Sequence, residues 1–180
     1  LESGRITVSR AARQAEFPAS FQLVAAMNPC KCGLLGHYSG KCRCTPDQVT
    51  QYRGRISGPL LDRIDMQVEV PAVTENELFS MEHGESSQKV RQRVVRARDI
   101  QLRRQGVANA RLSGSQIEQC AALEPNGRQL LRKAISRHQL SARANHRLLR
   151  VARTIADLDH SETVRDQHIA ESLGYRGVSG

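Results

Sequence analysis

The chain has 180 residues, 39% of them apolar, and a formal net charge of +9 at pH 7. This length suits one domain or two small ones, and the apolar fraction is enough for a buried core. No apolar run approaches the length of a membrane span and the N-terminus lacks a secretory pattern, so we expect no membrane partner and a cytoplasmic location. The positive charge favours an anionic partner, with nucleic acid first.

The N-terminal segment alternates at Ile6 and Val8 before Arg10 and Arg13. This pattern predicts a hairpin with the two arginines at its tip, although a solvated surface turn fits it equally well. The apolar run 21–27 follows and predicts a buried strand that ends at Asn28. The Asn28 amide could orient a water or a phosphate there, or Asn28-Pro29 could simply be a turn.

Four cysteines follow in the pattern C-x-C-x9-C-x-C, with glycines between the pairs. The members are Cys30, Cys32, Cys42 and Cys44. Four thiolates in one loop can close a tetrahedral zinc site, and the glycines permit the sharp turns that it needs. His37 is a possible substitute ligand. The alternative is a set of reduced free thiols, which would be exposed to oxidation.

After the cysteine loop, Thr45-Pro46-Asp47-Gln48 predicts a helix that begins with a cap and runs to about Arg55. Ser57-Gly58-Pro59 ends it and starts a single turn over 60–64, and 65–70 alternates as a strand. Arg63 lies between Asp62 and Asp65. It could form a weak surface ion pair, or it could reach the phosphate of a neighbouring subunit as an arginine finger.

A composition change within 71–86 predicts a boundary between a domain 1–75 and a helical domain 76–180. The helix 89–104 has seven basic residues and one acid, and it is either a solvated helix or a nucleic-acid contact through Arg93 and Arg96. Further helices are expected over 113–122, 126–138, 141–158 and 164–173. On 141–158, the stripe through Leu148, 151–152, 155 and 158 faces the core, whereas Arg143, Arg147 and Arg150 share another face. Cys120 is expected in the core.

Three motifs in this order resemble the C-terminal part of the magnesium chelatase-like AAA+ ATPases of the YifB/ComM type. They are FQLVAAMNPCKCG, CRCTPDQVTQYRGRISGPLLDRID and SARANHRLLRVARTIADL. The resemblance covers nearly the whole chain. It implies a mixed α/β, mostly helical fold in which the end of an AAA+ core precedes an all-α lid.

The resemblance also implies roles for particular residues. Segment 6–17 would be a hairpin that touches DNA in the central pore of a homo-hexamer, through Arg10 and Arg13. Asn28 would be sensor 1, Arg63 the arginine finger and Arg143 the sensor 2 arginine of the lid. The cofactors of the parent protein would be ATP and Mg²⁺, with Zn²⁺ on the cysteines.

Walker A and Walker B motifs are missing from these 180 residues. We therefore expect a fragment of a longer ATP hydrolase that is inactive by itself. The first functional hypothesis is a hexameric, ATP-dependent DNA motor of the ComM type, which acts in branch migration during natural transformation. The alternatives are a non-catalytic, zinc-stabilised nucleic-acid-binding module and a magnesium chelatase subunit, and the arginine-rich surface argues mildly against the latter.

Overall fold

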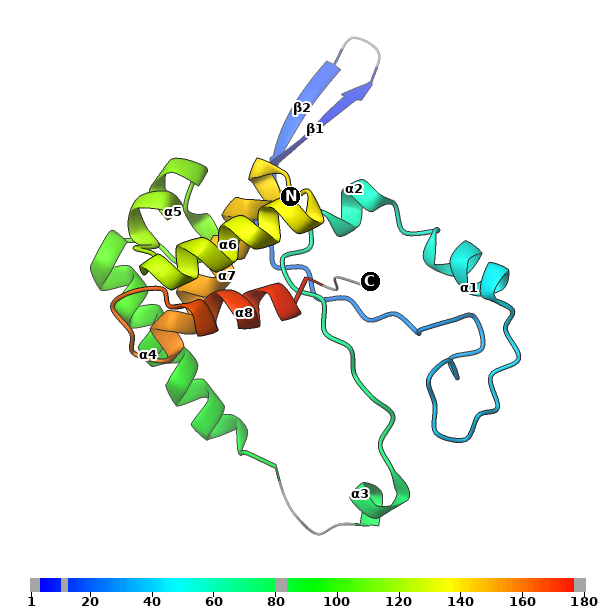
Figure 1. The fold of residues 1–180 in the computed structure, drawn as a ribbon. Coiled ribbons are helices and arrows are strands. Elements are labelled where there is room, and N and C mark those ends of the chain that lie inside the picture. The colour runs from blue at the N-terminus through cyan, green and yellow to red at the C-terminus, as the bar shows by residue number, and fades with distance from the viewer. Residues whose placement is uncertain (1–3, 11–12, 80–83, 177–180) are drawn as a thin grey trace. The chain divides into compact units, whose positions relative to one another are not determined.

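A computed structural model describes residues 4–10, 13–79 and 84–176 (Figure 1). The chain is mostly helical with one small sheet, and it divides into two compact units, Leu1–Arg63 and Ile64–Gly180. Within the described ranges, no helix is both long enough and apolar enough to cross a membrane. The two units are described separately below.

The first unit begins with an antiparallel hairpin of β1 (Arg5–Arg10) and β2 (Arg13–Pro18). Its register pairs Ile6 with Phe17 and Arg10 with Arg13, which confirms the hairpin predicted from the alternation. Cross-strand partners share a face, so apolar residues line one side of the ribbon. Ile6 and Phe17 are nevertheless about half exposed.

Two predicted strands are absent from the described part of the chain. Segments 21–27 and 65–70 contain no regular structure, and their side chains are largely exposed, with Val24 85% and Val70 83% accessible. A strand forms only where a neighbour satisfies its N–H and C=O groups. In the described ranges the hairpin strands pair only with each other, so neither segment lies beside a strand that it could pair with. The strand predictions were therefore wrong for this chain.

The helices of the first unit follow their capping signals. Helix α1 (Pro46–Arg53) begins after a complete capping box between Thr45 and Gln48 and ends two residues before the predicted limit. Helix α2 (Gly58–Leu61) is a single turn capped by the Ser57 hydroxyl, and it starts two residues earlier than predicted. Arg53 Nε donates to the carbonyl of Pro29 at 3.2 Å, which ties α1 to the start of the cysteine loop.

The second unit is helical, and its five predicted helices are confirmed to within a few residues at each end. Its elements are α3 (Glu75–Phe79), α4 (Ser87–Gln105), the 3-10 turn η1 (Asn109–Arg111), α5 (Gly114–Cys120), α6 (Pro125–His138), α7 (Ala142–Leu158) and α8 (Asp166–Gly174). Serine hydroxyls cap α4, α5 and α7, and a left-handed Gly106 ends α4.

Helix α7 lies at the centre of this unit and contacts α4, η1, α5 and α8. Its Leu148 and Ala152 are buried as predicted, in a core that also receives Ile117, Val164 and Ile169. Cys120 packs partly buried against this core, as expected. Because neighbours cover most of the circumference of α7, little of the helix remains for a solvated face.

One prediction for α7 was therefore wrong. Arg147 does not lie on a face away from the core but is 4% exposed, with its Nε 3.5 Å from Asp65 Oδ1. Arg150 is half-buried and donates from Nε and Nη2 to the carbonyl of Leu112. Long arginine stems pack well against apolar neighbours, which explains how both fit beside the core.

Candidate functional site

The four cysteines of the first unit converge on one point. Their sulfur atoms all lie within 4.8 Å of one another. The Cys30–Cys32, Cys32–Cys44, Cys32–Cys42 and Cys30–Cys42 separations are 3.4, 3.4, 3.6 and 3.8 Å. No pair is disulfide-bonded. The loop therefore brings all four predicted ligands together.

Tight turns in the loop produce this arrangement. Gly33, Gly36 and Gly40 all adopt positive φ, between +62° and +78°, where other residues are strained. The Gly33 N–H donates to the carbonyl of Cys30, and two further turns of the same kind follow at His37 and Gly40. These turns fold the nine-residue spacer back so that the second C-x-C pair meets the first.

The sulfur geometry fits a tetrahedral ion. At a zinc–sulfur distance of about 2.3 Å, the edges of a ZnS₄ tetrahedron are about 3.8 Å long, close to the separations observed. Cys30 is fully buried, whereas the other three are partly or largely accessible. His37 is not part of this group, and its Nδ1 instead accepts from the N–H of Ser39 at 3.1 Å. The four cysteines could therefore bind a metal such as zinc without a substitute ligand.

The pKa shifts of the thiols also fit a metal site. Burial raises the pKa of Cys30, but hydrogen bonds from the Cys32 thiol and from the amides of Leu35 and Cys32 outweigh it and lower that pKa to about 6. The Cys32 thiol hydrogen bond, with burial, raises the pKa of Cys44 to about 11. One thiolate is thus favoured while further ionisation is opposed, an imbalance that a divalent cation would relieve.

The residues assigned to nucleotide chemistry are all exposed. Asn28 follows the extended segment, and its side chain lies over Gly33 at 3.8 Å from where a β-carbon would be. Arg63 follows α2 and donates from Nη1 to the carbonyl of Pro59 at 3.0 Å. Arg143 lies in the first turn of α7, one turn before the buried Arg147. Of the three arginines in that row, Arg143 alone is on the surface.

The residues assigned to nucleic-acid contact differ in how open they are. Arg13 is exposed at the end of β2, opposite Arg10 in the register. The Ala11-Ala12 tip and the Arg10 side chain lie outside the described part of the hairpin. On α4, Arg96 is exposed, but Arg93 makes a two-pronged ion pair with Glu85, with N–O distances of 2.9 and 3.0 Å.

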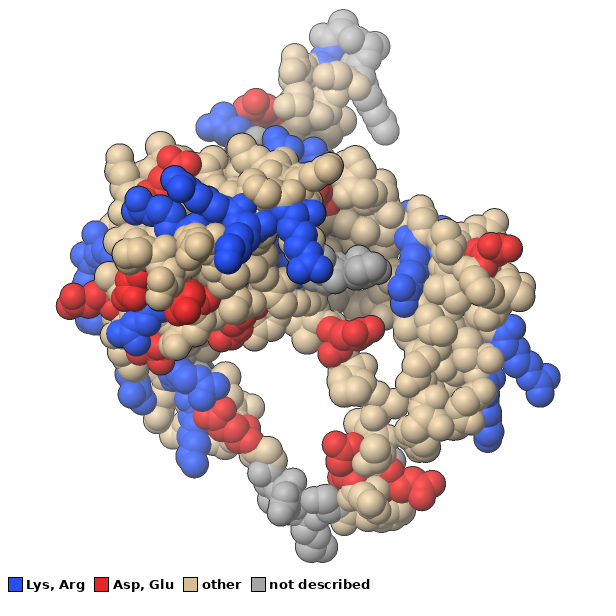
Figure 2. All heavy atoms as spheres, in the orientation of Figure 1, with Lys and Arg blue, Asp and Glu red and all other residues tan. Residues whose placement is uncertain are grey.

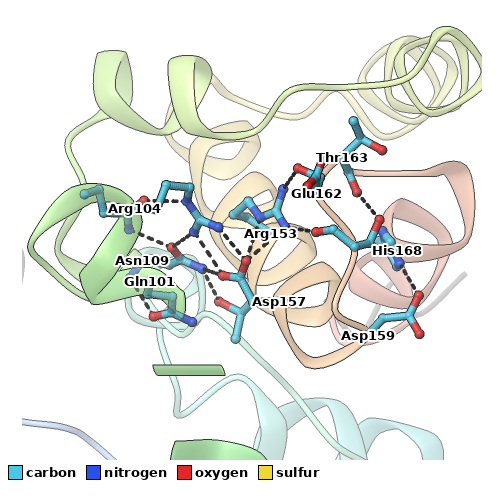
Figure 3. A network of polar contacts seen from close by, with 12 residues as sticks. Gln101, Arg104, Asn109, Arg153, Asp157, Asp159, Glu162, Thr163 and His168 are labelled. Atoms are coloured by element: carbon cyan, nitrogen blue, oxygen red, sulfur yellow. Dashed lines mark hydrogen bonds and ion pairs between the residues drawn. The ribbon is translucent and has the colours of Figure 1, made fainter. Parts of the chain in front are cut away.

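A buried polar network in the second unit was not anticipated from the sequence (Figure 3). The fully buried Asp157 accepts from Arg104 Nη1 at 2.6 Å and Nη2 at 3.0 Å, from Arg153 Nε at 3.1 Å and from Asn109 Nδ2 at 2.8 Å. Its hydrogen bond raises the pKa of Arg104, whereas burial lowers that of Arg153. Arg104 thus serves the core rather than a nucleic-acid surface.

The rest of the network ends at backbone groups and at α8. Arg153 also donates to the carbonyls of Ser161 and Glu162, which fixes the connection between α7 and α8. At the start of α8, the N–H of Arg165 donates to Nδ1 of the buried His168, so the proton of that ring lies on Nε2, 3.1 Å from Asp159 Oδ2. A sequence signal did exist, since Leu149, Arg153 and Asp157 repeat at four-residue spacing on the buried side of α7.

Comparison with known proteins places this arrangement in a family. A model described as magnesium chelatase, subunit ChlI, matches residues 1–78, and one for the ChlI C-terminal region matches residues 84–176. The chain belongs to the magnesium chelatase ChlI-like family. Within it, the chain is 45% identical to the competence protein ComM of Haemophilus influenzae over 180 residues.

Two other relatives of this ChlI-like chain are the YifB protein of Escherichia coli, 44% identical, and a Mycobacterium bovis protein, 37% identical. Each of the three alignments covers at least 98% of this chain. Each alignment covers only 35% of the relative, so this chain spans about a third of the length of these proteins. The resemblance read from the motifs is therefore confirmed at the level of the family.

Proposed function

We propose that this chain is the C-terminal part of a hexameric, ATP-driven DNA motor of the ComM type. In this proposal Asn28 acts as sensor 1, Arg63 as the arginine finger toward the ATP of the adjacent subunit and Arg143 as sensor 2. The observation that carries the proposal is the 45% identity to a competence protein in an alignment that covers 99% of this chain.

Local structure supports the choice of residues. A side chain that reaches a nucleotide held elsewhere must be accessible, and Asn28, Arg63 and Arg143 are exposed. Arg147 and Arg150 make poorer sensors because Arg147 is buried against Asp65 and Arg150 is half-buried against the Leu112 carbonyl. The 180 residues contain no phosphate-binding G-x4-G-K-[S/T] sequence, so they contribute to ATP chemistry from outside the nucleotide pocket.

The test uses a protein extended at the N-terminus to the length of the relatives. Arg63→Ala should reduce ATP hydrolysis by about 10³-fold, in the range known for arginine fingers, with ATP binding retained. Arg55→Ala, a change of another exposed arginine in the same unit, is the matched control and should hydrolyse ATP normally. Equal turnover in the two variants would contradict the finger assignment.

We further propose that the four cysteines hold one structural zinc ion that fixes the loop between Asn28 and α1. The sulfur separations and the opposed ionisation of the thiols support this role. Metal analysis of the purified chain should give about one zinc per chain, and Cys42→Ser should give much less. Under half an equivalent in the unmodified chain would favour free thiols.

The two alternative functions predict other results. A zinc-stabilised binding module without catalysis would bind DNA normally, but its extended form would not hydrolyse ATP. A magnesium chelatase subunit would hydrolyse ATP without stimulation by DNA. Measuring hydrolysis in the presence and absence of DNA therefore distinguishes all three.

A further inference from the structure

Helix α6 carries a strongly basic surface, to which the sequence pattern assigned no function. Between Pro125 and His138 it has four cations and no acidic residue. The cations are Arg128, Arg132, Lys133 and Arg137, all exposed, and we call them the α6 basic face. Figure 2 shows Lys and Arg atoms gathered over the part of the surface where α6 lies in Figure 1.

The opposite side of α6 is committed to the core. Gly127, Leu131 and Ala134 are buried, and Leu130 and Ile135 pack partly buried against the core cluster. Helix α6 therefore offers a partner its charges but no apolar stripe. An amphipathic helix that lies in a lipid surface must insert such a stripe, so the arrangement favours a polyanion read by charge over a membrane.

The four cations have a defined geometry on the helix. At 100° per residue, Arg128 and Arg132 form one row and Lys133 and Arg137 another, with Gln129 and Ser136 on the line between them. The face extends about 14 Å along the helix, at a rise of 1.5 Å per residue. A duplex carries about eight phosphate charges over that length, so one strand can meet cations from both rows.

The α6 basic face is also not neutralised by the protein itself. None of its four cations takes part in an ion pair within the described ranges. On α4, by contrast, Arg93 is paired with Glu85, Arg104 is paired with the buried Asp157, and Asp99 lies exposed among the remaining cations. Four like charges on one side of one helix repel one another, and phosphates would relieve that repulsion.

We infer that the α6 basic face binds the sugar-phosphate backbone of DNA, with one strand lying between the two rows of cations. The inference rests on the proposed function, since a DNA motor must hold its substrate, and it assigns that contact to α6 rather than to α4. Arginine and lysine contacts to phosphates carry no sequence information, so this binding is independent of base sequence.

The first test compares two variants of the 180-residue chain with equal net charge. One changes Arg128, Arg132, Lys133 and Arg137 to Gln, and the control changes the exposed Lys89, Arg91, Arg98 and Arg103 of α4 to Gln. Affinity for a labelled 20-base-pair duplex of mixed sequence is measured by fluorescence anisotropy over a series of KCl concentrations. Circular dichroism during heating checks that both variants fold.

The α6 variant should lose about 100-fold or more in affinity at about 50 mM salt. Its slope of log K against log salt should fall by about 3.6, which corresponds to four phosphate contacts. The α4 control should lose much less. Equal losses would mean that only net charge matters, a larger loss in the control would place the contact on α4, and no binding by the unmodified chain would remove the contact altogether. Each of these three results overturns the inference.

A second pair of variants tests the strand path. Gln129→Glu puts one negative charge between the two rows without removing a cation, and Gln92→Glu makes the same change on exposed α4. The first should weaken duplex binding at least about 10-fold more than the second, because it sits against the phosphates. Equal effects would overturn the path. Neither test reads ATP turnover, so their failure leaves the Arg63→Ala test of the proposed function untouched.

Discussion

The two units of this protein are organised in opposite ways. In the described part of the first, Leu1–Arg63, Cys30 is the only buried residue, and its order comes from a hairpin, glycine turns, helix caps and the cysteine cluster. In the second, ten buried residues form a shared core around α7, and a buried carboxylate links distant segments. The contrast teaches that local signals alone can shape a loop, whereas cooperative stability needs contacts between residues far apart in sequence.

The largest difference between the two units is expected when the metal is removed. Structural zinc supplies about 10–16 kcal/mol in small zinc-binding peptides, and the first unit has little else to hold its loop. A chelator should therefore speed amide hydrogen exchange over residues 28–55 by about 100-fold or more, and leave α7 protected. Cys120→Ala, which changes the one cysteine outside the cluster, should respond to chelator as the unmodified chain does. Unchanged exchange over 28–55 would show that no metal organises the loop.

The largest single-residue effect is expected at Asp157 in the second unit. Asp157→Asn leaves Arg153 buried without its carboxylate, and breaking a buried pair in this way costs about 3–5 kcal/mol. Urea unfolding of the 180-residue chain measures the change. Asp99→Asn, at an exposed position on α4, should stay within about 0.5 kcal/mol. Similar values for both variants would mean that the network adds nothing to the core.

A smaller loss is expected where two backbones meet. A β-carbon on Gly127 of α6 would lie 3.2 Å from the carbonyl oxygen of Val164 and 3.3 Å from the amide nitrogen of Asp166. Gly127→Ala should therefore destabilise the second unit by about 1–3 kcal/mol, although alanine favours helix by about 1 kcal/mol. Gly174→Ala, in α8 with open space around it, is the control. Stabilisation by Gly127→Ala would show that α6 and the 164–166 segment are not in close contact.

The smallest losses of stability are expected when the cap of one helix in each unit is removed. The Thr45 and Ser141 hydroxyls accept from the N–H groups of Gln48 and Ala144, and losing such a cap costs about 1 kcal/mol. Ser141→Ala should lower the unfolding free energy of the whole second unit, whereas Thr45→Ala should only increase hydrogen exchange in α1. Thermal denaturation and exchange measure the two. A global loss from Thr45→Ala would mean that the first unit also unfolds as one cooperative body.

The sequence predicted those features that depend on neighbouring residues. The capping box at Thr45, the hairpin, the helices of the second unit and the four-cysteine loop all follow from short patterns, and the structure has each of them. Whether 21–27 and 65–70 form strands could not be predicted from neighbouring residues. Apolar alternation indicates that a segment suits a sheet, but it does not supply the second strand that must bind it.

Buried charged residues were the second kind of feature that the sequence did not predict. Arg147, Arg153 and Asp157 are polar by type, so periodicity alone assigned Arg147 to a face other than the one toward the core and passed over the other two. Asp157 and Arg147 are buried against partners 53 or more residues away, Arg104 and Asp65, which no short window of sequence contains. The roles of Asn28, Arg63 and Arg143 came from the resemblance rather than from residue spacing, and they await the kinetic test.

The contact between Arg104 and Asp157 has a consequence for chain entropy. The two residues are 53 apart in sequence, and closing a loop of that length costs about 3.5 kcal/mol. Once formed, the two-pronged contact joins the ends of a loop that contains α5, α6 and nearly all of α7. It thereby acts as a reversible cross-link, which does for this helical unit what a disulfide does in a small secreted domain. Unlike a disulfide, this cross-link does not open under reducing conditions.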